Sequence, residues 1–416
     1  MNKPSRTSTA LSGIAVILRL SFFVFLVFLF LVAVKLFGSS VELLGGDFTK
    51  TLFTGLRNPF AGLAVGILAT AIIQSSSATT SIIVAMVGAG QLELPAAIPM
   101  VMGANIGTTI TCVIIAFGHV GDKNSFARAF AGSTVHDNFN ILTLAVLFPV
   151  ELVTRQIFGC GLLEGIALYL TGFLVGGSTL ASASASSLGS LNPVNATVTP
   201  VAKLILAFFK DIPWLTGVWQ AVPLMIFSLA LLLVSLIFIT NNMKVLMSGK
   251  AEAWIQKILT EKGYIGLLVG LFLTAIIQSS SITTSLLVPM YAAGILSPMQ
   301  AFPILIGANI GTTVTGLLAS TVTNSPLGIT IALAHTMFNV AGMMIFYPMP
   351  FMRKIPVGIS EWLAKLVMKN RMMAIIYVVV IFFMIPITGI FLWKETPEEN
   401  LPEPPAVMEQ IDPVAQ

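Results

Sequence analysis

The chain has 416 residues, of which 56% are hydrophobic and only 9% are charged, and its formal net charge is +4. A soluble domain carries about 25% charged residues, so this composition excludes an ordinary soluble protein and indicates an all-α, polytopic membrane protein. The basic residues are scattered through short loops, a pattern that sets membrane topology rather than one that binds nucleic acid.

Taken in chain order, the apolar stretches predict about seven crossings of the membrane. The first, at 11–37, is long enough to span a bilayer. We interpret it as an anchor helix, because no small-residue cleavage site of a signal peptide follows it. The other predicted crossings are 95–118, 127–148, 220–240, 298–320, 327–349 and 373–393. The stretches 60–90 and 264–294 are each divided by the letters QSSS into halves shorter than the roughly 20 residues of a span, so we expect two re-entrant helical hairpins.

Two phrases are written twice in the chain. AIIQSSSATTS at 71–81 returns as AIIQSSSITTS at 275–285, and GANIGTTIT at 103–111 returns as GANIGTTVT at 307–315. The second phrase predicts that both spans containing it are interrupted. Non-helical backbone at membrane depth survives only where it is buried in protein or lines a water-filled cavity. The doubling therefore predicts a transport site at the interface between two repeats.

Loop charges predict the orientation of the crossings. With the N-terminus in the cytoplasm, the basic residues near the ends of the spans fall on the cytoplasmic side, as the positive-inside rule expects. They are Lys3, Arg6, Lys123, Arg128, Lys244, Lys250, Lys257, Lys262, Arg353, Lys354, Lys365, Lys369 and Arg371. One repeat then starts outside and the other inside, so the repeats have inverted topology, and the C-terminus is periplasmic.

This topology divides the chain into seven segments. They are an N-terminal tail and anchor helix (1–57), repeat 1 (58–150), an outer-side linker with an interfacial helix at 166–175 (151–219), a span and cytoplasmic loop (220–262), repeat 2 (263–350), an interfacial helix at 359–368 with the last span (351–395) and a disordered acidic tail (396–416). Pro193 and Pro200 are expected to break helical structure in the linker. Whether 162–182 spans the membrane stays open.

The cores of both repeats lack formal charge but are rich in hydroxyls and amides. Residues 263–352 contain no Lys, Arg, Asp or Glu, and between 58 and 121 the only such residue is Glu93. Polar groups at membrane depth need partners. Half-helices that begin after QSSS would point N–H groups at an anion, while free carbonyls and hydroxyls suit sodium. In this uncharged site the two ions would neutralise each other, so each would raise the affinity for the other.

The doubled phrases, together with FARAFAGSTVHDNFN at 126–140 and ALAHTMFN at 332–339, resemble the type II sodium–phosphate cotransporters over roughly residues 10–395. The resemblance implies a bacterial inner-membrane symporter that takes up inorganic phosphate with sodium by alternating access. The expected partners are phosphate, sodium and the lipid bilayer; no cofactor or nucleic acid is expected, and a homodimer stays open. Animal relatives carry a long external loop with a disulfide, whereas Cys112 and Cys160 are the only cysteines here and support neither a disulfide nor a metal site.

The resemblance also implies which residues form the site. The phosphate-binding residues are Gln74, Ser75, Ser76, Ser77, Gln278, Ser279, Ser280 and Ser281. Sodium ligation is carried over to Thr312 and Thr315 and by symmetry to Thr108 and Thr111, and the neighbouring candidates are Thr79, Thr80, Asn105, Thr283, Thr284 and Asn309. Apart from the resemblance, the candidates for supporting the site are His136, Asp137, Asn140, His335 and Asn339. The histidines and asparagines match between the repeats, and a buried, hydrogen-bonded packing role is favoured for them over substrate contact.

Simpler interpretations of these residues compete with the functional ones. Hydroxyls in membrane helices often bond only to their own backbone, and glycines such as Gly66 and Gly270 are interpreted as close-packing positions. Asp137 is either functional, as a carboxyl in a span is by default, or it caps locally or pairs with Arg128. The alternative functions are transport of another oxyanion such as sulfate, or an anion channel or receptor. An enzyme is disfavoured, because the repeat cores hold no paired carboxylates and no credible Ser/His/Asp set.

Overall fold

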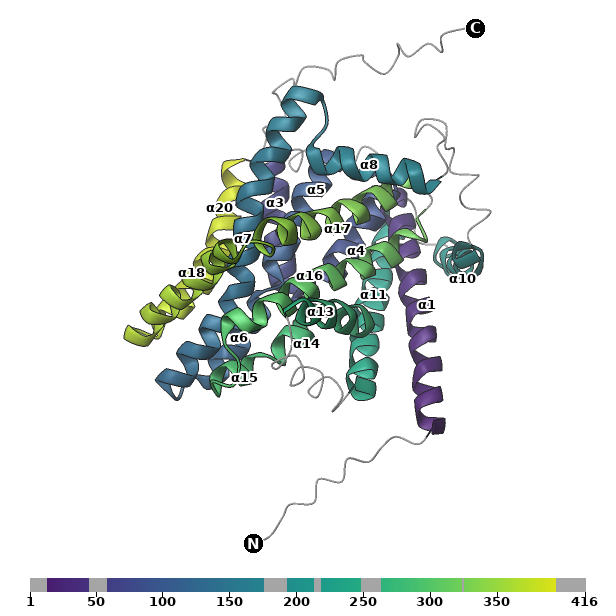
Figure 1. Ribbon diagram of the computed structural model, residues 1–416. Coiled ribbons are helices and arrows are strands. Elements are labelled where there is room, and N and C mark those ends of the chain that lie inside the picture. Colours follow the sequence, from purple (N-terminus) through teal and green to yellow (C-terminus); the bar gives the residue numbers. More distant parts are fainter. Residues whose placement is uncertain are drawn as a thin grey trace.

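The computed structural model describes residues 13–44, 58–175, 193–212, 218–247, 263–323 and 325–393, and every regular element in these ranges is a helix (Figure 1). Seven of the described helical stretches are long and apolar enough to cross a membrane: Ile14–Leu43, Leu94–His119, Lys123–Phe158, Trp219–Met243, Pro298–Ser320, Pro326–Phe346 and Met372–Leu392. They coincide with the seven predicted crossings. The prediction of an all-α, multi-pass membrane protein is therefore confirmed.

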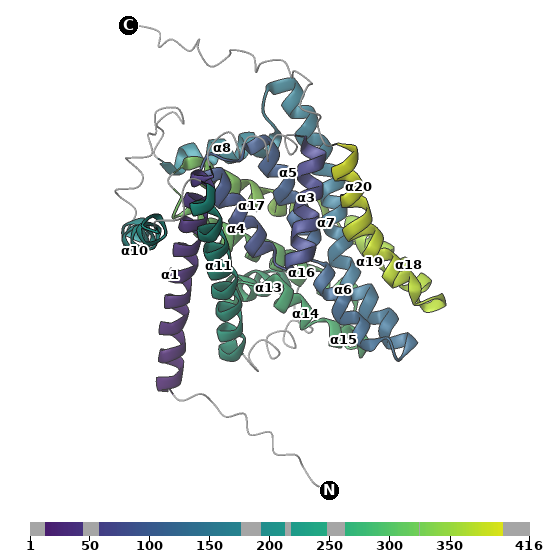
Figure 2. The same ribbon diagram turned by 180° about the vertical axis from the view of Figure 1, so that it is seen from behind.

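The helix α1 (Gly13–Leu43) packs along α11 (Val218–Met247), and both figures show them side by side (Figures 1 and 2). The Arg19 guanidinium donates to Asn242 Oδ1 at 3.2 Å, and Asn242 Nδ2 returns a bond to the Arg19 carbonyl at 2.8 Å. Nearer the C-terminal end of α1, the Lys35 ammonium donates to Asn195 Oδ1 at 2.5 Å. Asn195 belongs to α10 (Pro193–Lys210), which packs against both α1 and α11.

The two repeats are built from matching helices. The first contains α3 (Pro59–Ile73), α4 (Ser76–Gly88), α5 (Leu94–Gly107), α6 (Ile110–Ala116), the short η1 (Phe117–His119) and α7 (Lys123–Phe158). The second contains α13 (Gly263–Ile277), α14 (Ser280–Ser285), α15 (Val288–Ala292), α16 (Pro298–Ser320) and α17 (Pro326–Phe346). The repeats pack across each other, because α4 contacts α16 and α17 while α14 and α15 contact α6, and α15 also contacts α7.

Glycines bring the first helix of each repeat close to the helix that contains the GANIG letters. A Cβ at Gly66 would lie 2.0 Å from the Met100 carbonyl oxygen, and one at Gly270 would lie 2.1 Å from the Ile304 carbonyl oxygen. The GANIG glycines do the same from the other side, since a Cβ at Gly307 would lie 2.0 Å from the Leu267 carbonyl oxygen. The interpretation of these glycines as close-packing positions agrees with this geometry.

The prediction that both GANIGTT spans are interrupted is wrong for the second repeat. There α16 runs through residues 307–315 without a break. In the first repeat α5 ends at Gly107 and α6 begins at Ile110, but Thr108 and Thr109 keep right-handed helical dihedral angles. The physical reason is that the phrase supplies small residues for close helix packing, which the helical backbone makes possible, while its threonine hydroxyls are satisfied by carbonyls of the preceding turn.

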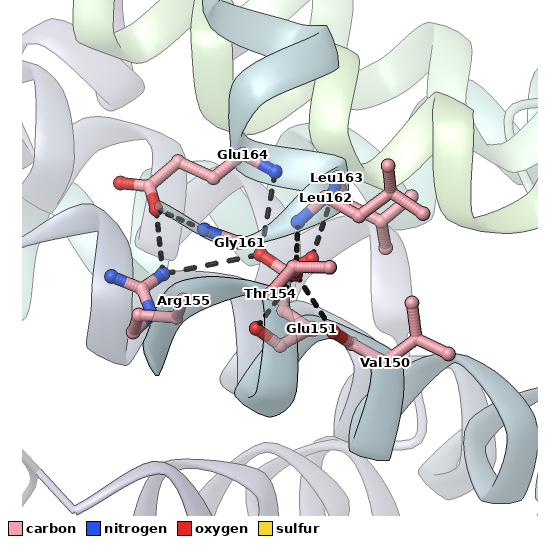
Figure 3. A network of polar contacts seen from close by, with 8 residues as sticks. All are labelled: Val150, Glu151, Thr154, Arg155, Gly161, Leu162, Leu163 and Glu164. Atoms are coloured by element: carbon pink, nitrogen blue, oxygen red, sulfur yellow. Dashed lines mark hydrogen bonds and ion pairs between the residues drawn. The ribbon is translucent and has the colours of Figure 1, made fainter. Parts of the chain in front are cut away.

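The turn from α7 into α8 (Leu162–Val175) is fixed by side chains, as Figure 3 shows. Glu151 accepts bonds from the N–H groups of Leu163 and Glu164 at 2.6 and 3.3 Å. Thr154 Oγ1 accepts from the N–H of residue 162 at 2.8 Å, and Arg155 pairs with Glu164 at 2.7 Å. Because the N-terminal N–H groups are satisfied, α8 can leave α7 sharply. It lies across the upper end of the molecule in Figure 1, and its 14 residues are too few for a span.

The prediction that Pro193 and Pro200 break helical structure is wrong. Pro193 is the first residue of α10, where its missing N–H removes no helical bond. Pro200 lies inside the same helix. Residues 176–192 of the predicted linker and the predicted acidic tail lie outside the described residues. The division of the chain into seven segments stays a prediction.

The last helices are α18 (Pro350–Lys369), α19 (Met372–Val379), the π-helical turn η2 (Val380–Met384) and α20 (Ile385–Leu392). The helix α18 packs along α7 with small and apolar residues buried and Lys354, Lys365 and Lys369 exposed. The predicted amphipathic helix at 359–368 therefore exists, within a longer one. In both Figures 1 and 2, α1 begins at the lower face and α20 ends toward the upper face.

The helix α7 begins at the lower face, where Asp122 caps it by accepting the Ser125 N–H at 2.8 Å (Figure 1). Hydrogen bonds from the side chain and backbone of Ser125 hold the pKa of this exposed carboxyl below its usual value. The basic residues Lys123 and Arg128 follow within the first two turns. The described part of the chain thus places these two cations at the same face as the start of α1.

Candidate functional site

In each QSSS segment the helix breaks at the glutamine and the serine that follows it. Gln74 ends α3 with φ 56°, and Gln278 ends α13 with φ 60°. In the described ranges these are the only residues other than glycine with positive φ. The next residue caps the following helix in each copy: Ser75 Oγ accepts the N–H of residue 78, and Ser279 Oγ accepts that of residue 282. Glutamine in the left-handed region is strained, and such strain collects at functional sites.

In the second repeat, the glutamine at the helix break is hydrogen-bonded within a cluster of polar side chains. Thr315 Oγ1 donates to Gln278 Oε1 at 2.8 Å, and the same hydroxyl lies 3.2 Å from Ser77 Oγ. Ser77 also donates to the Gln278 carbonyl oxygen at 3.5 Å. The three side chains are 0% to 6% exposed. We call them the closed triad, and it joins the QSSS segment of one repeat to the QSSS and GANIGTT segments of the other.

The corresponding triad of the first repeat is not made. Its members are Gln74, Thr111 and Ser281, at the positions that match Gln278, Thr315 and Ser77 in the repeat. Gln74 is exposed, whereas Gln278 is 6% exposed. The Thr111 hydroxyl is buried and has no hydrogen-bond partner among the described residues. We call these three the open triad. Two nearly identical sequence phrases therefore occupy two different states in one structure.

A second network links the asparagines of the GANIGTT segments to the histidines of α7 and α17. His136 Nε2 donates to Asn309 Oδ1 at 2.5 Å, and Asn309 Nδ2 donates to Asn140 Oδ1 at 2.6 Å. Asn140 Nδ2 in turn donates to the Asn105 carbonyl oxygen at 3.0 Å. The matching pair, His335 and Asn105, is looser at 3.4 Å. Each repeat thus holds the polar segment of the other.

This network is also asymmetric. Asn339, the match of Asn140, donates only to the carbonyl of His335 on its own helix at 3.1 Å, and its Oδ1 has no partner in the described part of the chain. Both the closed triad and the tight asparagine–histidine network centre on α16. The structure therefore shows tighter polar contacts at Gln278, Asn309 and Thr315 of the second repeat than at the matching residues of the first.

Several predicted sodium ligands are occupied by their own helix. Thr79, Thr80, Thr284 and Thr312 each donate to the carbonyl four residues earlier, at 2.7 to 3.1 Å. Thr108 and Thr283 do the same at 2.9 and 3.4 Å. These donations use the hydroxyl hydrogen and leave the oxygen lone pairs able to accept or to ligate a cation. Ser76 and Ser280 are buried in the first turn of α4 and α14.

Asp137 does not pair with Arg128, which excludes that one of the alternatives left open for it. Its Oδ2 accepts the Tyr377 hydroxyl of α19 at 2.9 Å, its side chain is 0% exposed, and its Oδ1 has no partner among the described residues. Arg128 lies more than two turns earlier on α7 and donates instead to the Ala292 carbonyl at 3.0 and 2.6 Å. The separation along α7 is the physical reason, because it takes the two side chains apart.

Lys35 and Tyr377 were not among the residues predicted from the sequence. Lys35 interrupts the first apolar run, which was a usable signal, because a charge inside a span marks a partner or a function. The structure gives it Asn195 as a partner. Tyr377 carried no signal in the sequence, since a tyrosine in a span is ordinary, and only the packing of α19 brings it to Asp137.

Comparisons with known proteins point to one family. The sequence profile described as Na+/Pi-cotransporter matches residues 29–175 and 231–352. Sodium-dependent phosphate transport protein 2A of Rattus norvegicus is 32% identical, over 86% of this chain and 65% of its own length. Protein 2B of Homo sapiens is 31% identical (87% and 63%), and protein 2A of Ovis aries is 33% identical (86% and 65%). The chain spans slightly less than two thirds of these relatives, and no solved structure matches it.

Proposed function

The chain belongs to the Na+/Pi-cotransporter family, and on that premise we propose that it is a secondary transporter that takes up inorganic phosphate together with sodium. The observation that carries the proposal is the closed triad, in which uncharged oxygen groups from both repeats meet in a buried place. Helix breaks at the interface of two repeats are where secondary transporters bind their substrates. We propose a carrier rather than an enzyme.

Phosphate is bound by side chains and by the N-terminus of α4. Ser76 and Ser77 lie in the first turn of this 13-residue helix, where free N–H groups and the helix dipole favour an anion. Gln278 and Ser280 complete the site from the other repeat. The contribution of α14 comes from these side chains rather than from its dipole, because α14 has only six residues.

Sodium is bound by the oxygens that the closed triad already gathers. The Thr315 hydroxyl bonds Gln278 Oε1, and the Ser77 hydroxyl is within hydrogen-bond distance of both Thr315 Oγ1 and the Gln278 carbonyl oxygen. Uncharged oxygens of this kind are the ligands that sodium takes in broken helices. Because Gln278 belongs to both sets, sodium and phosphate are adjacent and neutralise each other. Each ion therefore raises the affinity for the other by the same factor.

Transport proceeds by exchange between the closed triad and the open triad. In the state described here Gln278 is covered and Gln74 is exposed. In the opposite state Gln74 bonds Thr111 and approaches Ser281, while Gln278 becomes exposed. The asymmetry between matching residues supports this alternation. The protein lies in the bacterial plasma membrane with its N-terminus in the cytoplasm and its C-terminus outside, in line with the basic residues at the face where α1 begins.

The test is uptake of radiolabelled phosphate into proteoliposomes that hold the purified full chain. An inward sodium gradient is compared with a potassium gradient, and the wild type with Gln74→Ala and Gln278→Ala. Concentrative, sodium-dependent uptake that both variants lose supports the proposal. Uptake without a sodium effect refutes the coupling, and equal competition by sulfate would assign a broader oxyanion carrier. Equilibration without concentration would indicate a channel.

A further inference from the structure

A cavity of about 460 Å³ lies away from the repeat interface, between the start of α7, the turn from α15 into α16, and α18. Its volume is that of a small-molecule pocket. Its apolar lining includes Ala131, Leu296, Ala364 and Met368. The start of α7, α15 and the far end of α18 lie in the lower part of Figures 1 and 2, toward the face where α1 begins.

Two cations and one anion line the same cavity. They are Arg128 on α7 and Lys365 and Glu361 on α18, and all three are exposed. The Arg128 guanidinium is oriented by its bonds to the Ala292 carbonyl, which use Nε and Nη2. No described residue is bonded to Nη1, so one edge of an oriented guanidinium is left for an anion. A cavity with an apolar wall and a cationic rim fits an amphiphile with a negative head.

Tyr291 belongs to the inner wall of the cavity. Its side chain is 1% exposed and lines the cavity, and its hydroxyl has no hydrogen-bond partner among the described residues. The ring is held in place against Gly132, where a Cβ would lie 2.1 Å from it. A buried hydroxyl without a partner is costly. This hydroxyl is covered by protein atoms, so Tyr291 contributes a fixed, buried side chain to the inner wall of the cavity.

We propose that this cavity binds an anionic phospholipid from the leaflet at this face. The headgroup phosphate binds Arg128 and Lys365, and the upper part of an acyl chain covers the apolar wall. A lipid is preferred over free phosphate because much of the wall is apolar and because α18 presents exposed Phe351, Trp362 and Met368 beside its lysines, as helices at a membrane surface do. The proposal does not depend on what the protein transports.

The test is native mass spectrometry of the full-length protein in detergent, titrated with phosphatidylglycerol or with phosphatidylcholine. We expect phosphatidylglycerol to bind more tightly. A basic side chain near an anionic lipid contributes about fivefold in affinity, so Lys365→Gln should weaken binding about fivefold and Arg128→Gln with Lys365→Gln about 25-fold. The matched control is Lys354→Gln with Lys369→Gln, which removes two charges from the same helix outside the cavity and should change binding less than twofold.

A cavity-filling variant protects the test against misfolding of the Arg128 variant. Ala364→Leu keeps every charge and should still reduce phosphatidylglycerol binding, because it fills the apolar wall. Equal affinity for the two lipids, or equal losses in the control pair and the cavity pair, would overturn the proposal. So would displacement of phosphatidylglycerol by excess inorganic phosphate, which would assign the cavity to free phosphate. Because lipid binding is measured without transport, failure here leaves the transport proposal standing.

Discussion

The sharpest prediction compares Thr315→Val with Thr111→Val. Valine keeps the shape of threonine and puts a methyl group in place of the hydroxyl. At residue 315 the hydroxyl donates to Gln278 at 2.8 Å and lies 3.2 Å from Ser77. Hydrogen bonds between membrane helices are worth about 0.6 kcal/mol on average and about 1.7 kcal/mol at most. Loss of two contacts should therefore lower the stability of the state described here by about 1 to 3 kcal/mol.

The matched variant Thr111→Val should differ from Thr315→Val in its effect on stability and resemble it in its effect on transport. Its hydroxyl has no partner among the described residues. The melting temperature of the detergent-purified Thr111→Val variant should therefore equal that of the wild type or be slightly higher. The alternation of the two triads requires this hydroxyl in the opposite state. Both variants should then take up less phosphate at a given sodium concentration, with the apparent sodium affinity falling about five- to 150-fold for Thr315→Val.

The two assays separate the triads from ordinary packing. Unfolding is followed by a fluorescence melting curve, and uptake is followed in proteoliposomes at several sodium concentrations. If Thr111→Val transports as well as the wild type while Thr315→Val does not, only one triad matters and the exchange is wrong. If both variants lose the same stability, the asymmetry seen between the repeats is not a property of the resting protein.

Three further predictions test the frame around the site. Gly66→Ala should abolish a monodisperse peak in size-exclusion chromatography, because its Cβ would lie 2.0 Å from a carbonyl oxygen, whereas Gly118→Ala, with nothing within 4 Å, should be tolerated. Tyr377→Phe removes the hydroxyl that donates to buried Asp137 and should lower stability by about 1 to 3 kcal/mol in a melting experiment; an unchanged melting point would contradict that contact. A membrane-impermeant maleimide added to intact cells should label Cys160, which is partly exposed at the turn from α7 into α8, but not buried Cys112; labelling only after lysis would place that turn in the cytoplasm.

The crossings and the helix breaks could be predicted from the sequence because both depend on local composition. Seven apolar stretches of sufficient length became seven candidate spans. At each QSSS phrase the first helix ends at a glutamine in the left-handed region. The next helix begins at the following serine, which is a strong N-cap residue. The predicted interruption at GANIGTT was wrong for the second repeat, because glycine has two different effects on helices. It weakens an isolated helix, but here it allows helices to approach within contact of each other's carbonyls.

The partners of the polar residues could not be predicted, because they depend on packing between distant segments. Nothing local connects Ser77 with Thr315, or His136 with Asn309. The choice between Arg128 and Tyr377 as the partner of Asp137 illustrates the same limit. Arg128 is near in sequence and Tyr377 is far, yet it is α19 that reaches the carboxyl. Proximity along a helix favours residues three or four apart, and nine positions exceed that reach.

The asymmetry between the repeats has a cause in the sequence that the doubled phrases conceal. Pro289 stands where the first repeat has Ala85. Proline lacks the N–H that would bond the carbonyl four residues earlier, and the segment after the second QSSS is accordingly divided into α14 and α15, whereas α4 is continuous. The long α4 also contacts α1, a helix that lies outside the repeats. Two unequal second halves hold the same glutamine break, so the two triads need not have equal free energy, and one of them can be closed while the other is open.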